Sequence, residues 1–549
     1  MLSAALSAVL SMVIAISAVT PRPPAPAPND TYWPKQVNLA PADRYGINLL
    51  AAWPYSRGAG VVIAVVDSGY VSHPEFSGRV LAGYDFVTDP EAARDGDGRD
   101  PNPRDEGDWV SQAESASSQA GSECEVRDSQ WHGTHVASIA LAATSNGVGL
   151  AGIAPEAMLL PVRAVARCGG TERDVADAIR WAAGAEVNGA PTNEHPADVI
   201  NLSISGEGSC SGPIAAAVEK ALSLGAVVVA AAGNDATDAL TRSPASCQGV
   251  ITVAAVDQSG RRTPYSNFGT AVSISAPGGT MLAGIIGASN EGSTIPRHFT
   301  YMRAAGTSSA APHVAGVIAL ARSFDRTTPA PELAALLQMS ATPFPLDPST
   351  GLPWAGDCDE GRCGAGIANA GAMLALMAAR PKPTVQFSAP ESLTIGLDGG
   401  ESAPVNATSG ADGLALAVLA VVSTSACSFA DGVVTALTAA SCRLRATVSG
   451  TRDAAPGSVD LVLNQVGLSS ELTARITAKI RLGRSAAATI AAASSGAWKA
   501  KSLTPKTCKI LGRRTVMAIG LGTCSVKVSI PVAGPYEAAS KTLKITITR

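Results

Sequence analysis

The sequence predicts an α/β fold with a doubly wound, mostly parallel sheet, followed by two small all-β modules. Three observations predict this fold. Short apolar runs alternate with helical segments from about residue 60 to 376, as in βα units. After residue 380 the helical period disappears, and Ser, Thr, Ala and Val dominate. The length of 549 residues exceeds what one core supports, so two or three domains are expected.

Changes of composition along the chain mark four segments. An apolar and Pro-rich start precedes the α/β domain, and the two modules follow it. The expected bounds are 1–28 for the start, 29–380 for the α/β domain, 381–478 for the first β-sandwich module and 479–549 for the second.

Charge and aromatic content exclude some classes of function. The formal net charge is −4 and only 4% of the residues are aromatic. We expect the charge to be spread along the chain, with no basic block that would follow phosphates or an anionic membrane surface. Nucleic-acid binding is therefore not expected.

The first residues are typical of an export signal. Residues 2–19 are almost wholly apolar, and small residues lie near an expected cleavage point at Ser17 or Ala18. No Lys or Arg precedes Arg22, so the charged start of such a signal is missing. An uncleaved membrane anchor is the alternative, because the length is borderline. The apolar run 413–422 is too short to span a bilayer and is expected to be a core strand.

The ten cysteines lie as near neighbours in the sequence. An even number with local spacing favours disulfides in an oxidising compartment. Zinc is the alternative, but no CxxC pair occurs and only six His are present. The expected pairs are Cys124–Cys168, Cys210–Cys247, Cys358–Cys363, Cys427–Cys442 and Cys508–Cys524.

The first strand of the α/β domain is expected at Val61–Val66, six apolar residues that suit burial on both faces. Asp67 follows at the carboxyl end, the edge where open α/β sheets place functional groups. The acidic segment 88–128 is too long for a plain connector, so we expect it to be functional or stabilised by an ion. The run WHGTHVASIALAA then predicts an apolar helix with His132 at its start.

Strands and helices alternate after that helix. The expected strands are 158–165, 197–205, 226–234 and 249–257, and the expected helices are 171–184, 213–225, one from Ser309, and 331–341. The run from Gly306 to Ala321 begins with a Gly-Thr-Ser turn, which places Ser308 at a helix N-terminus. Unpaired backbone N–H groups there favour developing negative charge.

Asp67, His132 and Ser308 together supply the roles of nucleophilic catalysis. A serine hydroxyl needs a general base to attack an amide, and the base needs a carboxylate that fixes its tautomer. Each residue alone has an ordinary structural interpretation, as a turn residue, a core histidine or an N-cap. The combination in one α/β unit favours a hydrolase.

Four segments carry a resemblance to a known family. VVDSG around Asp67, HGTHVA around His132, AAGN ending at Asn234 and GTSSAAPHVAG around Ser308 resemble the signature blocks of the subtilisin-like serine proteases. The resemblance covers roughly residues 30–376. It implies a subtilisin-like catalytic domain and a secreted serine endopeptidase that hydrolyses proteins or peptides through an acyl-enzyme. PVRAVARCGGT further resembles secreted bacterial members that contain disulfides.

The resemblance assigns a role to each matching residue. Asp67 corresponds to the orienting carboxylate, His132 to the general base and Ser308 to the nucleophile. The Asn234 side chain and the Ser308 backbone N–H correspond to the oxyanion hole. The implied substrate-binding residues are Ser203, Ile204, Ser205, Gly206, Ala231, Ala232 and Gly233. Asp235 could favour a basic residue before the scissile bond, or it could be a solvated surface carboxylate.

Structural calcium is the implied cofactor. SNGVGLAGIAP resembles the calcium loop of the family, with Glu75 where an Asp ligand usually stands. The implied ligands are Glu75, Thr144, Asn146, Val148 and Leu150. A second acidic group could bind another hard cation or form a solvated loop, and it consists of Asp95, Asp97, Asp100, Asp105 and Asp108.

A repeat indicates the two C-terminal modules. The segments 427–448 and 508–530 align with their cysteines 81 and 82 residues apart, which fits small Ig-like sandwiches, each with its own disulfide. They could bind a cell surface, a polymer or the substrate, or act as spacers. For the whole chain we expect an extracellular monomer. The alternatives are a surface adhesion protein with an inactive protease domain, and a serine esterase, although the Ser308 context lacks the GxSxG pattern.

Overall fold

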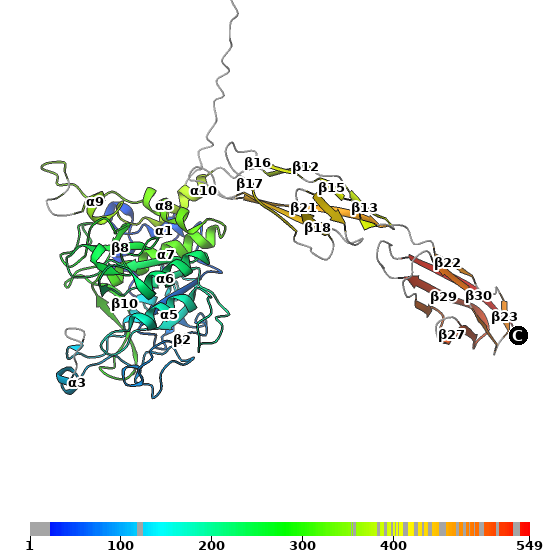
Figure 1. The fold of residues 1–549 in the computed structure, drawn as a ribbon, viewed down its shortest axis with the longest axis horizontal. Helices are drawn as coiled ribbons and strands as arrows, with labels where there is room; N and C mark the ends of the chain where they lie inside the picture. The colour runs from blue at the N-terminus through cyan, green and yellow to red at the C-terminus, as the bar shows by residue number, and fades with distance from the viewer. Residues whose placement is uncertain are drawn as a thin grey trace, which may run out of the picture. The chain divides into compact units, whose positions relative to one another are not determined.

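The computed structural model describes residues 22–117, 124–352, 354 and 358–380, and mainly the strands between 385 and 548 (Figure 1). The chain divides into two compact units, with the boundary between Pro381 and Lys382. The apolar segment 2–19 lies outside the described residues. None of the helices in the described part is both long and apolar enough to cross a membrane.

The first unit is built on a seven-stranded sheet in which all neighbouring strands are parallel. The strand order is β2-β3-β1-β4-β6-β8-β9. The apolar run predicted at 61–66 forms β1, and Asp67 is the last residue of this strand. The strands are β1 Val62–Asp67, β2 Tyr84–Asp85, β3 Met158–Arg163, β4 Val199–Leu202, β6 Val227–Ala231, β8 Ile251–Val256 and β9 Ile274–Pro277.

Helices cover both faces of this sheet, which confirms the predicted doubly wound α/β domain. Ile63 and Val65 of β1 belong to one apolar cluster, with α1, α4, α7, α8 and α10. Ala64 and Val66 point to the opposite face and belong to a second cluster, with α5 and α6. The helices are α1 Leu49–Ala52, α2 Pro90–Ala93, α3 Gln112–Ser117, α4 His132–Leu141, α5 Glu172–Ala182, α6 Gly212–Ser223, α7 Thr307–Phe324, α8 Ala330–Met339, α9 Glu360–Cys363 and α10 Ala370–Ala379.

Two short antiparallel pairs were not expected from the sequence. The strands β10 Ile285–Asn290 and β11 Phe299–Ala304 pair with each other, and β5 Gly206–Glu207 pairs with β7 Arg242–Ser243. Gly287 and Ser289 interrupt the apolar pattern of β10, although the whole strand is buried. Short strands of this kind carry little local signal.

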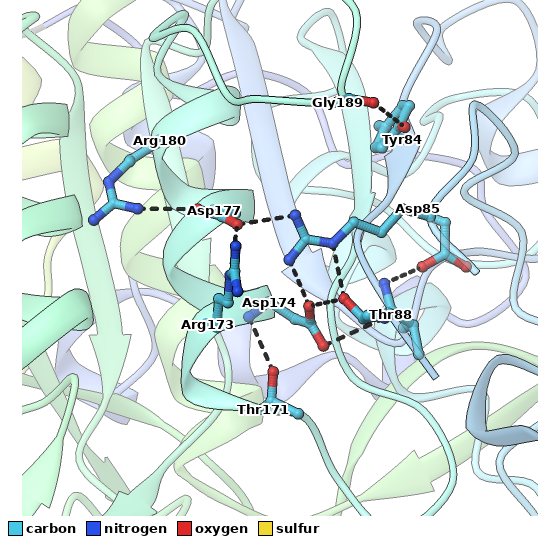
Figure 2. Close-up of polar contacts among 11 residues, drawn as sticks. Tyr84, Asp85, Thr88, Thr171, Arg173, Asp174, Asp177, Arg180 and Gly189 are labelled. Atoms are coloured by element: carbon cyan, nitrogen blue, oxygen red, sulfur yellow. Dashed lines mark hydrogen bonds and ion pairs between the residues drawn. The ribbon is translucent and has the colours of Figure 1, made fainter. Parts of the chain in front are cut away.

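Arginines hold the acidic segment against the sheet and α5. Arg163 of β3 is almost fully buried and contacts Asp85 at 2.6 Å and Asp95 at 3.0 Å. Arg99 contacts Asp174 at 2.6 Å and Asp177 at 2.9 Å, and Figure 2 shows the Asp174 carboxylate extending from α5 toward Thr88. Positive charge from two distant arginines therefore compensates these carboxylates within the chain.

Four of the five predicted disulfides are present: Cys124–Cys168, Cys210–Cys247, Cys358–Cys363 and Cys508–Cys524. The predicted pair Cys427–Cys442 lies outside the residues whose side chains the structure describes. No described cysteine is free.

The described elements of the second unit are all strands. Those up to β21 lie in a five-stranded sheet of order β14-β13-β21-β20-β17, a three-stranded sheet of order β15-β19-β18, and the pair β12-β16. A strand is present within the apolar run 413–422 as β17, and its place in a core stays a prediction. These strands are β12 Val385–Ser388, β13 Ser392–Gly396, β14 Gly399–Gly400, β15 Ser402–Pro404, β16 Asn406–Ser409, β17 Leu416–Val421, β18 Cys427–Ala430, β19 Val433–Ala436, β20 Cys442–Val448 and β21 Gly457–Gly467.

The last part of the chain contains a four-stranded sheet of order β23-β30-β29-β26 and a three-stranded sheet of order β24-β28-β27. Both contribute to one apolar cluster, and the Cys508–Cys524 disulfide joins β27 to β29. The Ig-like architecture and the module boundary at 478 stay predictions. The strands are β22 Leu472–Arg475, β23 Lys479–Arg481, β24 Ser485–Ala487, β25 Thr489–Ala492, β26 Lys499–Ser502, β27 Cys508–Leu511, β28 Thr515–Ala518, β29 Gly522–Ile530 and β30 Ala539–Thr548.

Candidate active site

The carboxyl end of β1 meets the N-terminus of α4, and this junction joins Asp67 to His132. Trp131 adopts a left-handed backbone conformation, with φ 53°, immediately before the helix. The His132 Nδ1 atom lies 2.7 Å from Asp67 Oδ1, which also accepts a hydrogen bond from the Ser68 backbone N–H. Asp67 is fully buried, whereas the His132 side chain is 31% exposed. The carboxylate can therefore fix the imidazole tautomer while the other ring nitrogen remains available for proton transfer.

Further carboxylates lie behind this pair. Ser68 Oγ donates to Asp105 Oδ2 at 2.7 Å and accepts a hydrogen bond from the Gly133 N–H, so Asp105 is linked to both ends of the junction. Burial alone would lower the pKa of His132, but Asp67, Asp108 and Asp105 raise it above its usual value. Burial raises the pKa of Asp105 itself to about 7.

Ser308 and Asn234 side chains lie on either side of Gly306. The Asn234 Oδ1 atom accepts hydrogen bonds from the Thr307 N–H at 2.8 Å and the Thr307 hydroxyl at 2.9 Å, which orients the Asn234 amide. A Cβ at Gly306 would lie 3.0 Å from Ser308 Oγ and 3.4 Å from Asn234 Nδ2. The absence of a side chain at Gly306 therefore leaves space beside the Ser308 hydroxyl and the Asn234 amide.

A cleft of about 420 Å³ lies beside Asp67 and His132. Of the predicted substrate-binding residues, Ile204, Ser205 and Gly206 line it. Ser203 Oγ instead donates to the Ser308 carbonyl at 2.9 Å. The remaining predicted residues lie outside this lining, because Ala231 and Ala232 are buried and a Cβ at Gly233 would lie 2.3 Å from Asn267 Nδ2.

Another part of the cleft wall contains Gly169 and Gly170, which precede α5. The Cys124–Cys168 disulfide anchors this wall, and Thr171 Oγ1 accepts a hydrogen bond from the Asp174 N–H at 3.1 Å as the N-cap of α5 (Figure 2). Two segments far apart in the sequence, 169–170 and 204–206, thus line the same cleft.

The remaining histidines of the two motifs are structural. His135 Nε2 lies 3.1 Å from the Ile285 carbonyl, and burial lowers the pKa of His135 to about 4. His313 contacts Asn38 Nδ2 and the Ser309 carbonyl, both at 2.8 Å, and burial lowers its pKa to about 4 as well. Both rings are therefore neutral at ordinary pH.

The predicted calcium loop contains one carboxylate that the sequence analysis missed. Asp30 accepts hydrogen bonds from the Thr144 hydroxyl and from the N–H groups of Ser145 and Asn146. Glu75 Oε1 accepts from the Leu150 N–H and from the Tyr301 hydroxyl. Glu75 Oε2 is buried without a hydrogen-bond partner, and burial raises the pKa of Glu75 to about 7. Asp30 had no local signal, because it lies in an N-terminal arm more than 100 residues from the loop.

The other predicted metal ligands do not converge. Asp95 pairs with Arg163, Asp105 accepts from Ser68, and Asp108 accepts from the Gln130 N–H. Asp97 donates its N–H to Asp95, and the Asp100 side chain accepts from the Asn102 N–H. Among the described residues, no group of three or more His, Cys, Asp or Glu could hold a metal ion.

Asp235 is engaged by a cation of the same chain. Its carboxylate lies 3.2 Å from Arg242, and the Asp235 side chain is 48% exposed. Arg242 therefore partly neutralises the Asp235 carboxylate, which reduces its ability to attract a basic substrate residue.

Comparisons with known proteins agree with this geometry. The model of the subtilase family matches residues 58–366, more than half of the chain. An extracellular protease of Xanthomonas campestris is 44% identical over 346 residues, which are 63% of this chain and 56% of that protein. An extracellular basic protease of Dichelobacter nodosus is 40% identical over 58% of this chain and 53% of its own length. Thermitase of Thermoactinomyces vulgaris is 34% identical over 60% of this chain and 95% of its own.

A solved structure is similar as well. A protease from Pseudoalteromonas arctica is 40% identical, with a TM-score of 0.59 over 64% of this chain and 100% of that one. The chain spans little more than half the length of the first two curated relatives. From the family match, the identity to thermitase and the arrangement around Asp67, the chain belongs to the subtilase family.

Proposed function

We propose that this chain is an extracellular serine endopeptidase that cleaves peptide bonds through an acyl-enzyme on Ser308. The observation that carries the proposal is the 2.7 Å contact between His132 Nδ1 and Asp67 Oδ1 at the edge of the sheet, beside a cleft. Its relatives include two proteins named extracellular proteases, and four disulfides favour an oxidising compartment.

In the proposed reaction, the Ser308 hydroxyl attacks the substrate carbonyl and His132 Nε2 takes its proton. Asp67 stabilises the resulting imidazolium, which is consistent with a His132 pKa above its usual value. The negative charge on the substrate oxygen is stabilised by Asn234 Nδ2 and the Ser308 N–H. His132 then gives the proton to the leaving amine, and water completes the cycle by the same steps.

A substrate would bind in an extended conformation between Gly169–Gly170 and Ile204–Gly206. Backbone pairing of this kind reads an extended peptide with few demands on its side chains. The cleft lining supports this arrangement, because both segments line the same cleft as Asp67 and His132. Proteins with flexible loops or unfolded segments are therefore the substrate class proposed.

The proposed calcium site would be formed by Asp30, Glu75 and Asn146 with the carbonyl groups of the loop 144–150. The buried, unpartnered Glu75 Oε2 atom and the nearby Asp30 charge fit an oxygen-seeking cation, which would act structurally. Calcium titration of the full chain by calorimetry tests this, and Asp30→Asn should abolish any heat of high-affinity binding.

Labelling with a fluorophosphonate tests the nucleophile. The wild type should react, whereas Ser308→Ala should neither react nor digest casein. Ser309→Ala is the matched control, because Ser309 is the buried neighbour in the same helix turn and should keep both activities. A Ser308→Ala variant that folds, as judged by circular dichroism, and still digests casein would refute the proposal.

A further inference from the structure

The charge of the chain is unevenly distributed, so the expectation of an evenly spread charge is wrong. Residues 479–549 contain 13 Lys and Arg and a single acidic residue, Glu537, which gives a net charge of +12. The first 478 residues contain the other 28 Lys and Arg and 44 of the 45 Asp and Glu, a net charge of −16. Counted over the whole chain, the two contributions nearly cancel.

The strand register places five of these 13 basic side chains on one face of the four-stranded sheet β23-β30-β29-β26. Lys501 pairs with Lys527, and Lys527 in turn pairs with Thr542. Because side chains alternate along a strand, Lys544 two residues further shares the face of Thr542. On the other face of the same strand, Leu543 and Ile545 are buried in the apolar cluster.

The edge strand β23 continues this surface. Lys479 pairs with Thr546 and Arg481 pairs with Thr548, and both threonines share the face of Lys544. All of these cations are exposed. We call this surface the basic face, and it consists of Lys479, Arg481, Lys501, Lys527 and Lys544.

The cations of the basic face follow a diagonal. From Lys501 and Lys527 the line passes to Lys544, one row further along the strands, and then to Lys479 and Arg481 on the opposite edge. With strands about 4.8 Å apart and alternate residues about 6.8 Å apart, the diagonal is about 25 Å long. Hydroxyl side chains lie beside it, namely Thr523, Ser525, Thr542, Thr546 and Thr548.

No carboxylate of the chain compensates these charges in the described residues. Beyond residue 478 the only acidic residue is Glu537, which lies outside them. None of the five cations forms an ion pair there with an Asp or Glu, whereas Arg99 and Arg163 in the first unit each contact two carboxylates. A line of exposed, uncompensated cations attracts an external polyanion.

We propose that the basic face binds a linear anionic polysaccharide and so attaches the enzyme to an acidic extracellular polymer. Lysine ammonium groups attract carboxylate or sulfate groups, and the flanking hydroxyls can hydrogen-bond to sugar hydroxyls. A diagonal row of cations suits a linear polymer, whose charges repeat along one line.

Other polyanions fit this surface less well. The four-stranded sheet is about 14 Å wide between its outer strands, so it cannot enter the major groove of DNA, which is about 12 Å wide. The described residues of the face include no aromatic side chain that could stack on the bases of a single strand. A membrane-binding surface would also need a row of apolar residues. Among the described residues after 478, the exposed large apolar ones are Leu503, Leu511, Ile519 and Leu521, and none of them lies in a strand of the four-stranded sheet.

Binding of the full chain to immobilised polygalacturonate tests the proposal. Neutral dextran is the control polymer, and binding should weaken steeply between about 0.05 and 0.5 M NaCl. The triple variant Lys501→Gln, Lys527→Gln, Lys544→Gln should bind about 100-fold more weakly at low salt, since each cation near an anionic surface contributes about fivefold. The corresponding triple Lys→Arg variant keeps the charge and should restore binding.

A second triple variant separates the face from the overall charge. Arg484, Lys506 and Lys509 are exposed and lie on or beside the other sheet, so their change to Gln removes the same charge elsewhere. The affinity of this control should fall by less than about threefold.

Equal losses of affinity in the two triple variants, or no binding by the wild type, would overturn the proposal. Tighter binding to duplex DNA or to phosphatidylglycerol vesicles at the same ionic strength would overturn the choice of a polysaccharide. Hydrolysis of a soluble peptide by the same variants does not depend on binding to the polymer, so it tests the proposed protease function separately.

Discussion

The acidic residues between positions 85 and 110 and the cations of the basic face differ in whether the chain itself compensates their charges. In the acidic segment, buried carboxylates are compensated within the chain: Arg163 contacts Asp85 and Asp95 with almost no solvent exposure. On the basic face, like charges lie side by side in solvent without a carboxylate partner in the described part of the chain. A buried charge without a partner costs several kcal/mol, whereas exposed like charges repel only weakly. Charges of the first kind hold the fold and the site, and charges of the second kind are available to an external partner.

The largest expected effect concerns the buried charge at the site itself. Asp67→Asn removes the negative charge from His132 Nδ1 and allows the wrong imidazole tautomer, so kcat should fall by about 10⁴-fold. Steady-state hydrolysis of a peptide substrate measures this loss. The exposed pair Arg57 and Glu156, at 3.0 Å, provides a control, because Glu156→Gln should leave kcat unchanged. A fall in kcat of less than tenfold in Asp67→Asn would contradict the role of this buried carboxylate in orienting the His132 ring.

Arg163→Met sharpens the comparison for a structural charge. The change leaves Asp85 and Asp95 facing each other without a cation, which should lower the free energy of unfolding by about 3–5 kcal/mol. Denaturant unfolding followed by tryptophan fluorescence measures the difference. Arg173→Met is the control: Arg173 is 86% exposed at 4.0 Å from Asp177, and its loss should cost about 0.5 kcal/mol or less. Equal effects of the two changes would contradict the distinction between buried and exposed pairs.

Asp105→Asn tests a buried carboxyl that has a hydrogen bond from Ser68 and no salt bridge in the described residues. Since burial raises the pKa of Asp105 to about 7, the folded protein keeps a proton there that the unfolded chain releases near pH 4. Wild-type stability should therefore fall as the pH rises from about 4 to 7, and the Asn variant should lack this fall. The difference in melting temperature, variant minus wild type, should be larger at pH 8 than at pH 5 by about 3 °C or more.

The activity of Asp105→Asn provides a second readout. The charges of Asp67, Asp108 and Asp105 all raise the pKa of His132, and Asp105 carries its charge once its own proton leaves near pH 7. Its removal should therefore move the acidic limb of the kcat/KM profile to lower pH. Asp97→Asn is a control that removes an exposed carboxylate from the same segment, and the limb should stay in place. A stability difference independent of pH, with an unmoved limb, would contradict the titration of Asp105.

These contrasts also show what the sequence could and could not predict. The apolar run before Asp67 predicts β1, and the helices that begin at His132 and Thr307 follow from their motifs, because all three signals are local. The five aspartates were compatible with either a bound cation or a solvated loop, but Arg163 supplies charge to Asp95 from 68 residues away. Pairing over such a distance leaves no periodic pattern, and the same holds for Asp30 in the loop at 144–150.

The basic face illustrates a different reason for missing a feature. Its charge excess was present in the sequence, but a net charge summed over two oppositely charged parts conceals it. Even the local excess does not show which cations share a surface, because that depends on register. A shift of β26 by one residue would move Lys501 to the other face. The excess of Lys and Arg is therefore visible in the sequence of residues 479–549, whereas the diagonal arrangement of the cations follows only from the strand pairings.

The smallest expected effect is a slight gain in stability on the basic face. Lys501 and Lys527 lie directly opposite each other, so Lys501→Gln should stabilise the sheet by about 0.2–1 kcal/mol at low salt. Hydrogen exchange of the β26 and β29 amides measures this gain, and it should vanish near 0.5 M NaCl, where charges are screened over about 4 Å. Lys479→Gln is the matched control, because Lys479 lies opposite Thr546 and its loss should change exchange much less. If Lys501→Gln instead accelerated exchange at low salt, Lys501 would stabilise the fold as Arg163 does. The cations of the basic face would then be compensated within the chain, as in the acidic segment, and would not be available to an external partner.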